Sequence, residues 1–373
     1  MLDRRMPVKV GIVCRNLLPS YNNKWLIPFV KYMDPSRVKF TGLALSEFSQ
    51  EDESISLPLS KFINIYGSPS VDKYGKHDFK NIQRIGESSI LGISQVYAAS
   101  NILLTVGMES TFVEALLNPA YKSKEYGAKI VTVSHSYQPP YKDPRYGKGA
   151  NYLVASCQEA AQAFSQLYRS KVKIIHNGVD VNSVCPTEPR EESRKKIGIQ
   201  NNEIVIGLLG DREANDIDNA EKAVAKLNEN LIKNSSENSY KLLVISDFPD
   251  MHLGNILNTI DVALYTSFEP ICYDNLILEA MFSSVPIITT NTGVYEDLKE
   301  ISNYNIAKEL SYNDPTSIAH AISDVRTCCY ETSTVDPAFN LVWSKMSASY
   351  SAARWAEFLE DIMKNNGESN AHE

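Results

Sequence analysis

Short apolar runs alternate with helical patterns along the first half of the chain. Runs rich in valine, isoleucine and leucine, typical of buried strands, lie at 8–14, 38–45, 102–106, 129–133, 153–156 and 172–175. Segments 25–33 and 158–168 instead carry apolar residues at helical spacing. Strands that alternate with helices form βαβ units, so this half predicts a mostly parallel sheet.

The same pattern starts again after a polar stretch at 177–202, which is rich in Pro, Glu and Arg and which we interpret as a linker. A helix is predicted at 218–233, and strands are predicted at 203–210, 241–246, 261–266 and 285–290. The chain is thus expected to be an α/β protein with two Rossmann-like domains, 1–176 and 203–342, and an interdomain cleft. Residues 343–364 are predicted as a single C-terminal helix, and residues 365–373 as a disordered tail.

The composition is that of a folded globular protein and excludes disordered and collagen-like chains. Of its 373 residues, 43% are hydrophobic and 22% charged, and no apolar run approaches the roughly 20 residues of a membrane-spanning helix. The first seven residues lack the apolar stretch of a signal peptide. The six cysteines are scattered without a CxxC pair, which favours reduced thiols over a structural zinc site. We therefore expect a cytoplasmic protein.

The net charge of −8 is unevenly distributed along the chain. Residues 1–176 carry 22 Lys and Arg against 14 Asp and Glu, whereas residues 177–373 carry 15 against 31. A basic half can face an anionic acceptor or an anionic membrane surface, although solvated surface charge often has no partner. Nucleic acid is not expected, because no basic stretch is interleaved with aromatic residues.

Candidate chemistry is concentrated in residues 266–281. A predicted strand ends at Thr266, and a predicted helix starts at Asp274 or Asn275. A helix N-terminus beside a strand end offers free N–H groups and a positive dipole, which suit a phosphate. Glu269 on the loop and Glu279 in the second helical turn add carboxylates, which accept hydrogen bonds from sugar hydroxyls. Taken alone, either glutamate is better explained as an ordinary solvated charge than as a site residue.

Several motifs in this half resemble one known family. They are Asn275–Met281, Val285–Gly293 with Glu296, His176–Asp180, Leu243–Pro249 and the segment that begins at Trp343. In this order and spacing they resemble the retaining GT-B glycosyltransferases of family GT4, also called glycosyl transferases group 1. In the first half only Val131–His135 resembles the family, as its strand that ends in histidine.

The resemblance implies a GT-B fold in which the C-terminal helix crosses back to the first domain. It also implies transfer of a sugar from a nucleotide-sugar donor to a glycan, lipid or protein hydroxyl, with retention of configuration and without a metal or other cofactor. Glu279 would hold the nucleotide ribose, while His135 and Glu269 would act at the donor sugar. The further donor-binding candidates are Arg15, Arg212, Asn275, Thr292 and Gly293.

Three departures from the family pattern make the donor site divergent. Ile271 stands where the first glutamate is expected, so Glu269 takes that role only after a loop insertion. Asp216 falls near the position of a lysine, and residues 14–19 replace a glycine-rich loop. A catalytically degenerate GT-B protein that binds a sugar or nucleotide, or serves as a partner subunit, therefore remains the alternative. Nucleotide-sugar epimerases share the fold but fit these motifs less well.

Overall fold

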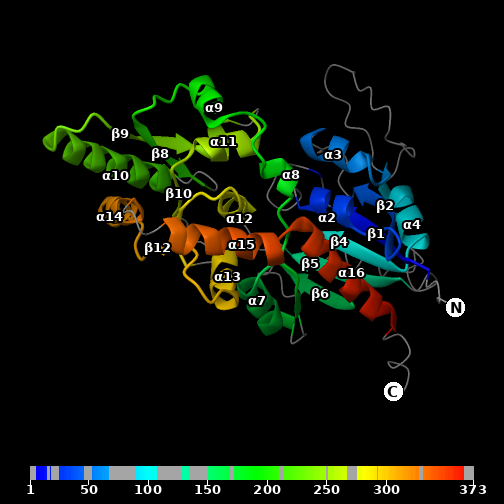
Figure 1. Ribbon diagram of the computed structural model, residues 1–373. Coiled ribbons are helices and arrows are strands. Elements are labelled where there is room, and N and C mark those ends of the chain that lie inside the picture. The colour runs from blue at the N-terminus through cyan, green and yellow to red at the C-terminus, as the bar shows by residue number, and fades with distance from the viewer. Residues whose placement is uncertain are drawn as a thin grey trace. The chain divides into compact units, whose positions relative to one another are not determined.

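The computed structural model divides the chain into two units, one of Met1–Gly178 with Ala348–Glu373 and one of Val179–Ser347. Figure 1 shows the elements of both units along the chain. The structure describes residues 6–14, 17, 25–45, 53–66, 89–106, 128–134, 150–168, 172–209, 214–248, 251–266, 275–291, 293–326 and 331–364.

The first unit is built on a parallel sheet with the strand order β3-β2-β1-β4-β5-β6-β7 among the described residues. Every neighbouring pair runs parallel, as the alternation of strands and helices predicts. The strands are β1 Val8–Cys14, β2 Val38–Leu45, β3 Ile65–Tyr66, β4 Ile102–Val106, β5 Lys129–Ser134, β6 Tyr152–Ala155 and β7 Val172–Ile174.

The central strands of this sheet are apolar almost throughout, because helices cover both faces of a parallel sheet. All five residues of β4 are buried, and in β1 only Lys9 is exposed. The helices of the unit are α2 Leu26–Tyr32, α3 Glu53–Ser60, α4 Ser89–Ala98, α7 Gln158–Tyr168 and α16 Ala348–Lys364.

The last helix, α16, packs on the first unit through an aromatic cluster. The Trp355 side chain is 1% exposed, and its ring stacks on Trp25 with centroids 6.0 Å apart. Phe29 meets Trp355 edge-on at 5.3 Å. At the rim, the Arg37 guanidinium donates to both carboxylate oxygens of Glu360, at 2.8 and 2.9 Å. The predicted return of the C-terminal helix to the first domain is confirmed.

The second unit contains a parallel sheet with the described strand order β12-β11-β10-β8-β9. Its strands are β8 Glu203–Leu208, β9 Ser239–Val244, β10 Val262–Tyr265, β11 Ile287–Thr289 and β12 Lys308–Glu309. Its helices are α8 Val181–Val184, α9 Arg190–Lys196, α10 Ala214–Lys233, α11 Leu253–Thr259, α12 Asn275–Phe282, α13 Val294–Ile301, α14 Pro315–Val325 and α15 Asp336–Lys345. Among the described helices of either unit, none is long and apolar enough to cross a bilayer.

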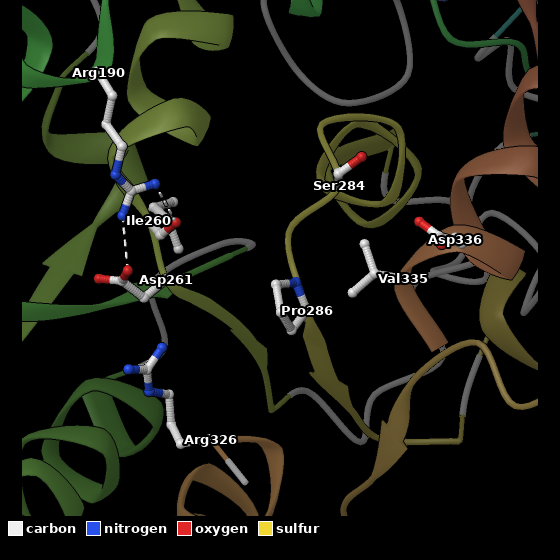
Figure 2. Close-up of a pocket in the computed structure, with 8 residues that line it drawn as sticks. All are labelled: Arg190, Ile260, Asp261, Ser284, Pro286, Arg326, Val335 and Asp336. Carbon is white, nitrogen blue, oxygen red and sulfur yellow. Dashed lines mark hydrogen bonds and ion pairs between the residues drawn. The ribbon is translucent and has the colours of Figure 1, made fainter. Parts of the chain in front are cut away.

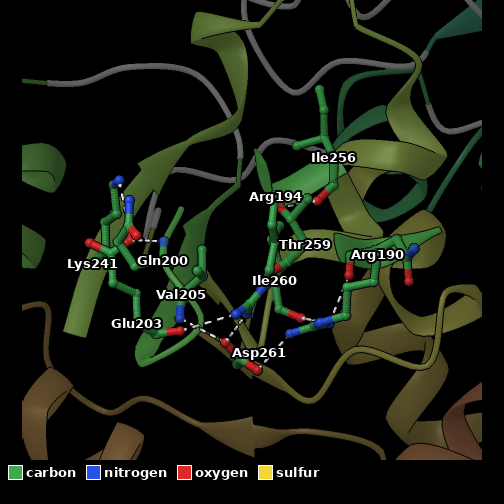
Figure 3. A network of polar contacts seen from close by, with 11 residues as sticks. Arg190, Arg194, Gln200, Glu203, Val205, Lys241, Ile256, Thr259, Ile260 and Asp261 are labelled. Carbon is green, nitrogen blue, oxygen red and sulfur yellow. Dashed lines mark hydrogen bonds and ion pairs between the residues drawn. The ribbon is translucent and has the colours of Figure 1, made fainter. Parts of the chain in front are cut away.

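A polar network around Asp261 joins α9 to this sheet (Figure 3). Asp261 directly precedes β10, and its Oδ1 accepts a hydrogen bond from Arg190 at 2.7 Å. Its Oδ2 accepts from Arg194 and from the backbone N–H of Val205 in β8, both at 2.7 Å. Arg194 also donates to the carbonyl oxygen of Thr259. We call Arg190, Arg194, Val205 and Asp261 the Asp261 network.

Two sequence-based interpretations need revision in this region. Residues 343–364 do not form one helix, because α15 ends at Lys345 and α16 begins at Ala348. Between them Ser347 forms a β-bridge with Val179, whose N–H donates to the carbonyl oxygen of Met346 at 2.8 Å. This pairing uses extended backbone and so interrupts the helix. The stretch described as a linker likewise contains α8 and α9, which belong to the second unit from Val179 onward.

The buried indole of Trp355 should contribute strongly to stability. Trp355→Ala would leave a large cavity between α16 and α2, and we expect it to lower the free energy of unfolding by about 3–5 kcal/mol. Trp343→Ala is the matched control, because that indole is 54% exposed and stacks on Phe282 and Phe339 at the surface of the second unit. We expect the control to cost about 1 kcal/mol. Urea denaturation followed by circular dichroism measures both, and equal costs would contradict the packing described for α16.

Candidate functional site

The carboxyl ends of three parallel strands lie along one edge of the second sheet, which we call the carboxyl edge. Leu209, Thr266 and Thr290 directly follow β8, β10 and β11 there. The N–H of Leu209 donates to the carbonyl oxygen of Leu264 at 2.8 Å, and the N–H of Thr290 donates to the carbonyl oxygen of Tyr265 at 3.2 Å. Thr266 and Thr290 are 2% and 0% exposed, so two hydroxyl-bearing residues are buried where open parallel sheets bind ligands.

Helix α12 begins on this side of the sheet, where the sequence predicts a helix start. All of its apolar residues except the partly buried Leu276 are buried in the core of the second unit. Asn275 and Glu279 are only half-buried. They are four residues apart and therefore share one face of the helix. An amide and a carboxylate are thus placed one turn apart, starting at the N-terminal end, where the helix dipole favours negative charge.

The amide of Asn275 has unused hydrogen-bonding capacity. Its Oδ1 atom is buried and accepts no hydrogen bond from any residue that the structure describes. A buried acceptor left without a partner costs about 1–3 kcal/mol, so such atoms in native proteins usually have a specific reason. At the start of α12, a ligand that carries a donor group would satisfy this oxygen.

A second helix begins at the same edge after β11. Gly293 precedes α13 with φ 58° and ψ −131°, a backbone conformation that side chains with a Cβ atom disfavour. Its lack of a side chain leaves the first turn of α13 without a side-chain cap from this position. The first turns of α12 and α13 therefore both direct backbone N–H groups toward the carboxyl edge, an arrangement that suits an anion.

Asp216, which stands near the expected position of a lysine, has a structural partner. It lies in the first turn of α10, is 8% exposed, and accepts a hydrogen bond from the Asn313 side chain. Asn219 in turn donates to the carbonyl oxygen of Asn313 at 2.9 Å. The carboxylate thus ties α10 to the segment that leads into α14, and its place at a helix N-terminus is favourable.

The structure brings three of the predicted site residues onto neighbouring elements of the second unit: Asn275, Glu279 and Gly293. The others fall outside the described residues, and their roles stay predictions: Arg15, His135, Arg212, Glu269 and Thr292. Sequence reasoning missed the partners of Asp216 and Asp261, because they come from distant segments. The one available signal was the spacing of Arg190 and Arg194, which places both guanidinium groups on one face of a helix.

No group of three or more His, Cys, Asp or Glu side chains within the described ranges is arranged to hold a metal ion. The expectation of a reaction without metal or cofactor remains a prediction.

Comparison with known proteins supports the fold but does not assign the chain to a family. No protein-family model matches the chain. No curated protein matches it either.

Solved structures of glycosyltransferases do match, over nearly the whole chain. HepE from Anabaena, solved with UDP-glucose, matches with a TM-score of 0.69 and 17% identity over 95% of this chain and 99% of that chain. A glycosyltransferase from Rickettsia africae matches with a TM-score of 0.66 and 16% identity, covering 96% and 99%. WaaG, a glycosyltransferase of lipopolysaccharide biosynthesis, matches with a TM-score of 0.54 and 12% identity, covering 94% and 99%. The predicted α/β fold with two Rossmann-like, GT-B type domains is therefore confirmed.

Proposed function

We propose that this protein is a glycosyltransferase that takes its sugar from a UDP-sugar donor. The observation that carries the proposal is the pairing of Asn275 and Glu279 on one face of α12, at the carboxyl edge. The fold around this helix is shared with HepE, whose structure was solved with UDP-glucose. The start of α12 would receive the diphosphate, and the carboxylate of Glu279 would accept hydrogen bonds from the ribose hydroxyls.

The reaction we propose follows the retaining course implied by the family resemblance. The bond between the anomeric carbon and the diphosphate oxygen breaks, and the acceptor hydroxyl oxygen bonds to that carbon on the same face. The hydroxyl proton leaves with the departing UDP. We assign His135 and Glu269 to the donor sugar, and Arg15, Arg212, Thr292 and Gly293 to the diphosphate side. No metal takes part in this proposal.

The non-catalytic alternative loses one of its three supports. It rested on Ile271, on residues 14–19 and on Asp216, since an anion near the leaving diphosphate would be unfavourable. Asp216 is instead buried against Asn313, and its hydrogen bond explains its presence without reference to a ligand. We therefore favour the transferase. Binding of UDP to the parent protein is its first requirement, and a parent that binds no nucleotide would support the alternative.

The carboxylate of Glu279 should matter for donor binding and little for stability. Hydrogen bonds to a charged group contribute about 1.5–3 kcal/mol, so Glu279→Ala should weaken UDP binding by roughly ten- to a hundredfold. Because Glu279 is half-buried on the face of α12 away from the core, we expect the Tm without ligand to fall by no more than about 2 °C. Calorimetric titration with UDP measures the affinity.

Two variants serve as controls for this titration. Glu300→Ala removes the same side chain from an exposed position on α13 and should leave UDP binding unchanged. Asp216→Asn should lower stability while UDP affinity stays at the parent value, because Asp216 is engaged with Asn313. If Glu279→Ala binds UDP like the parent, the donor site is assigned wrongly. If Asp216→Asn binds UDP much more tightly than the parent, Asp216 repels the diphosphate and the non-catalytic alternative regains that support.

Stereochemistry and metal dependence can be measured before the acceptor is known. In the absence of acceptor, slow hydrolysis of UDP-α-glucose by a retaining enzyme releases α-glucose first, which proton NMR distinguishes from the β anomer. We expect the α anomer, and we expect excess EDTA to leave the rate unchanged. Release of β-glucose would refute retention, and loss of turnover with EDTA would refute the metal-free proposal.

The acceptor side of the proposal rests on charge. Residues 1–176 carry the basic excess, and we propose that the first unit faces an anionic acceptor or an anionic membrane surface. Sedimentation with vesicles of anionic lipid should then decrease steeply as salt rises, since surface charges are screened. Equal sedimentation with neutral and anionic vesicles would show that the basic charge has no membrane partner.

A further inference from the structure

The second unit contains a pocket near the amino ends of its strands, at the other end of the strands from the carboxyl edge (Figure 2). The pocket has a volume of about 430 Å³ and is lined by residues that precede strands, Asp261 before β10 and Pro286 before β11. Arg190 and Arg326 line it as well, together with Ser284 and Asp336. All these residues belong to one unit, so the pocket is defined without reference to the other.

Both carboxylate oxygens of Asp261 accept hydrogen bonds within the protein. Its Oδ1 accepts from Arg190 at 2.7 Å, and its Oδ2 accepts from both Arg194 and the N–H of Val205. The single negative charge of this carboxylate is thus shared by two guanidinium groups. The Nη1 atom of Arg190 donates to the backbone carbonyls of Asn258 and Ile260, which are neutral.

Arg326 is the second guanidinium group that lines the pocket, beside that of Arg190. It is exposed, follows the last residue of α14, and forms no ion pair with any residue that the structure describes. In Figure 2 the side chains of Arg190 and Arg326 approach Asp261 from either side. Burial lowers the pKa of Arg190, and the positive charges of Arg194 and Arg326 lower it further, whereas the negative charge of Asp261 opposes this shift. This wall of the pocket therefore has an excess of positive charge.

The opposite wall offers hydrogen-bonding groups of another kind. Ser284 ends the turn after α12 with φ 56°, a conformation in which glycine is far more common, and its side chain is exposed. Asp336 is exposed at the first position of α15. A hydroxyl and a carboxylate there can bind ligand hydroxyls, whereas a second anionic group would be repelled by Asp336.

We propose that this pocket binds a small phosphate monoester that carries hydroxyl groups, such as a sugar phosphate. The guanidinium group of Arg326 would bind the phosphate, since planar guanidinium matches phosphate oxygens in two parallel hydrogen bonds. Arg190, whose Nη atoms already donate within the protein, would add its positive charge beside the phosphate. Ser284 and Asp336 would bind hydroxyls of the ligand. The volume is within the range of pockets for small molecules.

The site is separate from the proposed donor site but connected to it by shared elements. Strand β10 lies between Asp261 in the pocket and Thr266 at the carboxyl edge. Helix α12 begins at Asn275 and leads into the turn at Ser284, which lines the pocket. The four residues of β10 span about 13 Å. A phosphate monoester and UDP should therefore bind at the same time.

Binding of inorganic phosphate and of glucose 6-phosphate to the full chain tests the proposal, with glucose as the uncharged comparison. By calorimetric titration, we expect glucose 6-phosphate to bind more tightly than phosphate and glucose not to bind. Arg326→Gln should weaken the binding of both anions at least about tenfold, because it removes one charged hydrogen-bonding partner. Asp336→Asn should strengthen the binding of inorganic phosphate, because it removes a repelling charge.

Lys222→Gln is the matched control, since it removes one positive charge from an exposed lysine that does not line the pocket. We expect Lys222→Gln to bind both anions like the parent. In the parent, we expect saturating UDP to leave the affinity for both anions unchanged. The proposal fails if the parent binds neither anion, if Arg326→Gln binds them like the parent, or if Lys222→Gln loses as much. It also fails if UDP displaces them, since they would then occupy the donor site. Loss of UDP binding alone would count against the proposed function and not against this pocket.

Discussion

One carboxylate, that of Asp261, holds together the parts of the second unit on which both proposed sites depend. It binds two arginines of α9 and the backbone of β8 from its position at the start of β10. These contacts attach α9 to the sheet and hold the start of β10 against Val205 within β8. Because β8 and β10 pair in parallel from this point, their carboxyl ends are aligned as well, where Leu209 and Thr266 lie. The same contacts leave the positive excess that characterises the pocket.

Most of the sheet could be predicted from the sequence, because buried parallel strands are nearly continuous apolar runs. Strands β1, β4 and β8 lie where such runs predict them, and α12 begins at Asn275, one of the two starts considered. The break between α15 and α16 could not be predicted. Apolar spacing continues through it, and the interruption depends on a bridge between Ser347 and Val179, which are far apart in sequence.

The same limit applies to the candidate site. The sequence places Asn275 and Glu279 on one helix because local spacing is sufficient for that. It gives no information about Asp216, whose partner Asn313 is 97 residues away, or about Arg194, whose partner Asp261 is 67 residues away. A charge that seems misplaced in a motif can therefore be satisfied by a segment that the motif does not include. The fold resemblance to glycosyltransferases is broad, whereas the chemistry rests on few residues.

Hydrogen exchange measured with and without UDP tests the central claim, that the donor binds at the start of α12. If the claim is correct, saturating UDP slows amide exchange in the segments 275–281 and 293–298, which are most of α12 and the start of α13 with the glycine before it. Glu279→Ala should lose this protection at the same UDP concentration. Protection confined to other segments, or no protection at any UDP concentration, would contradict the account.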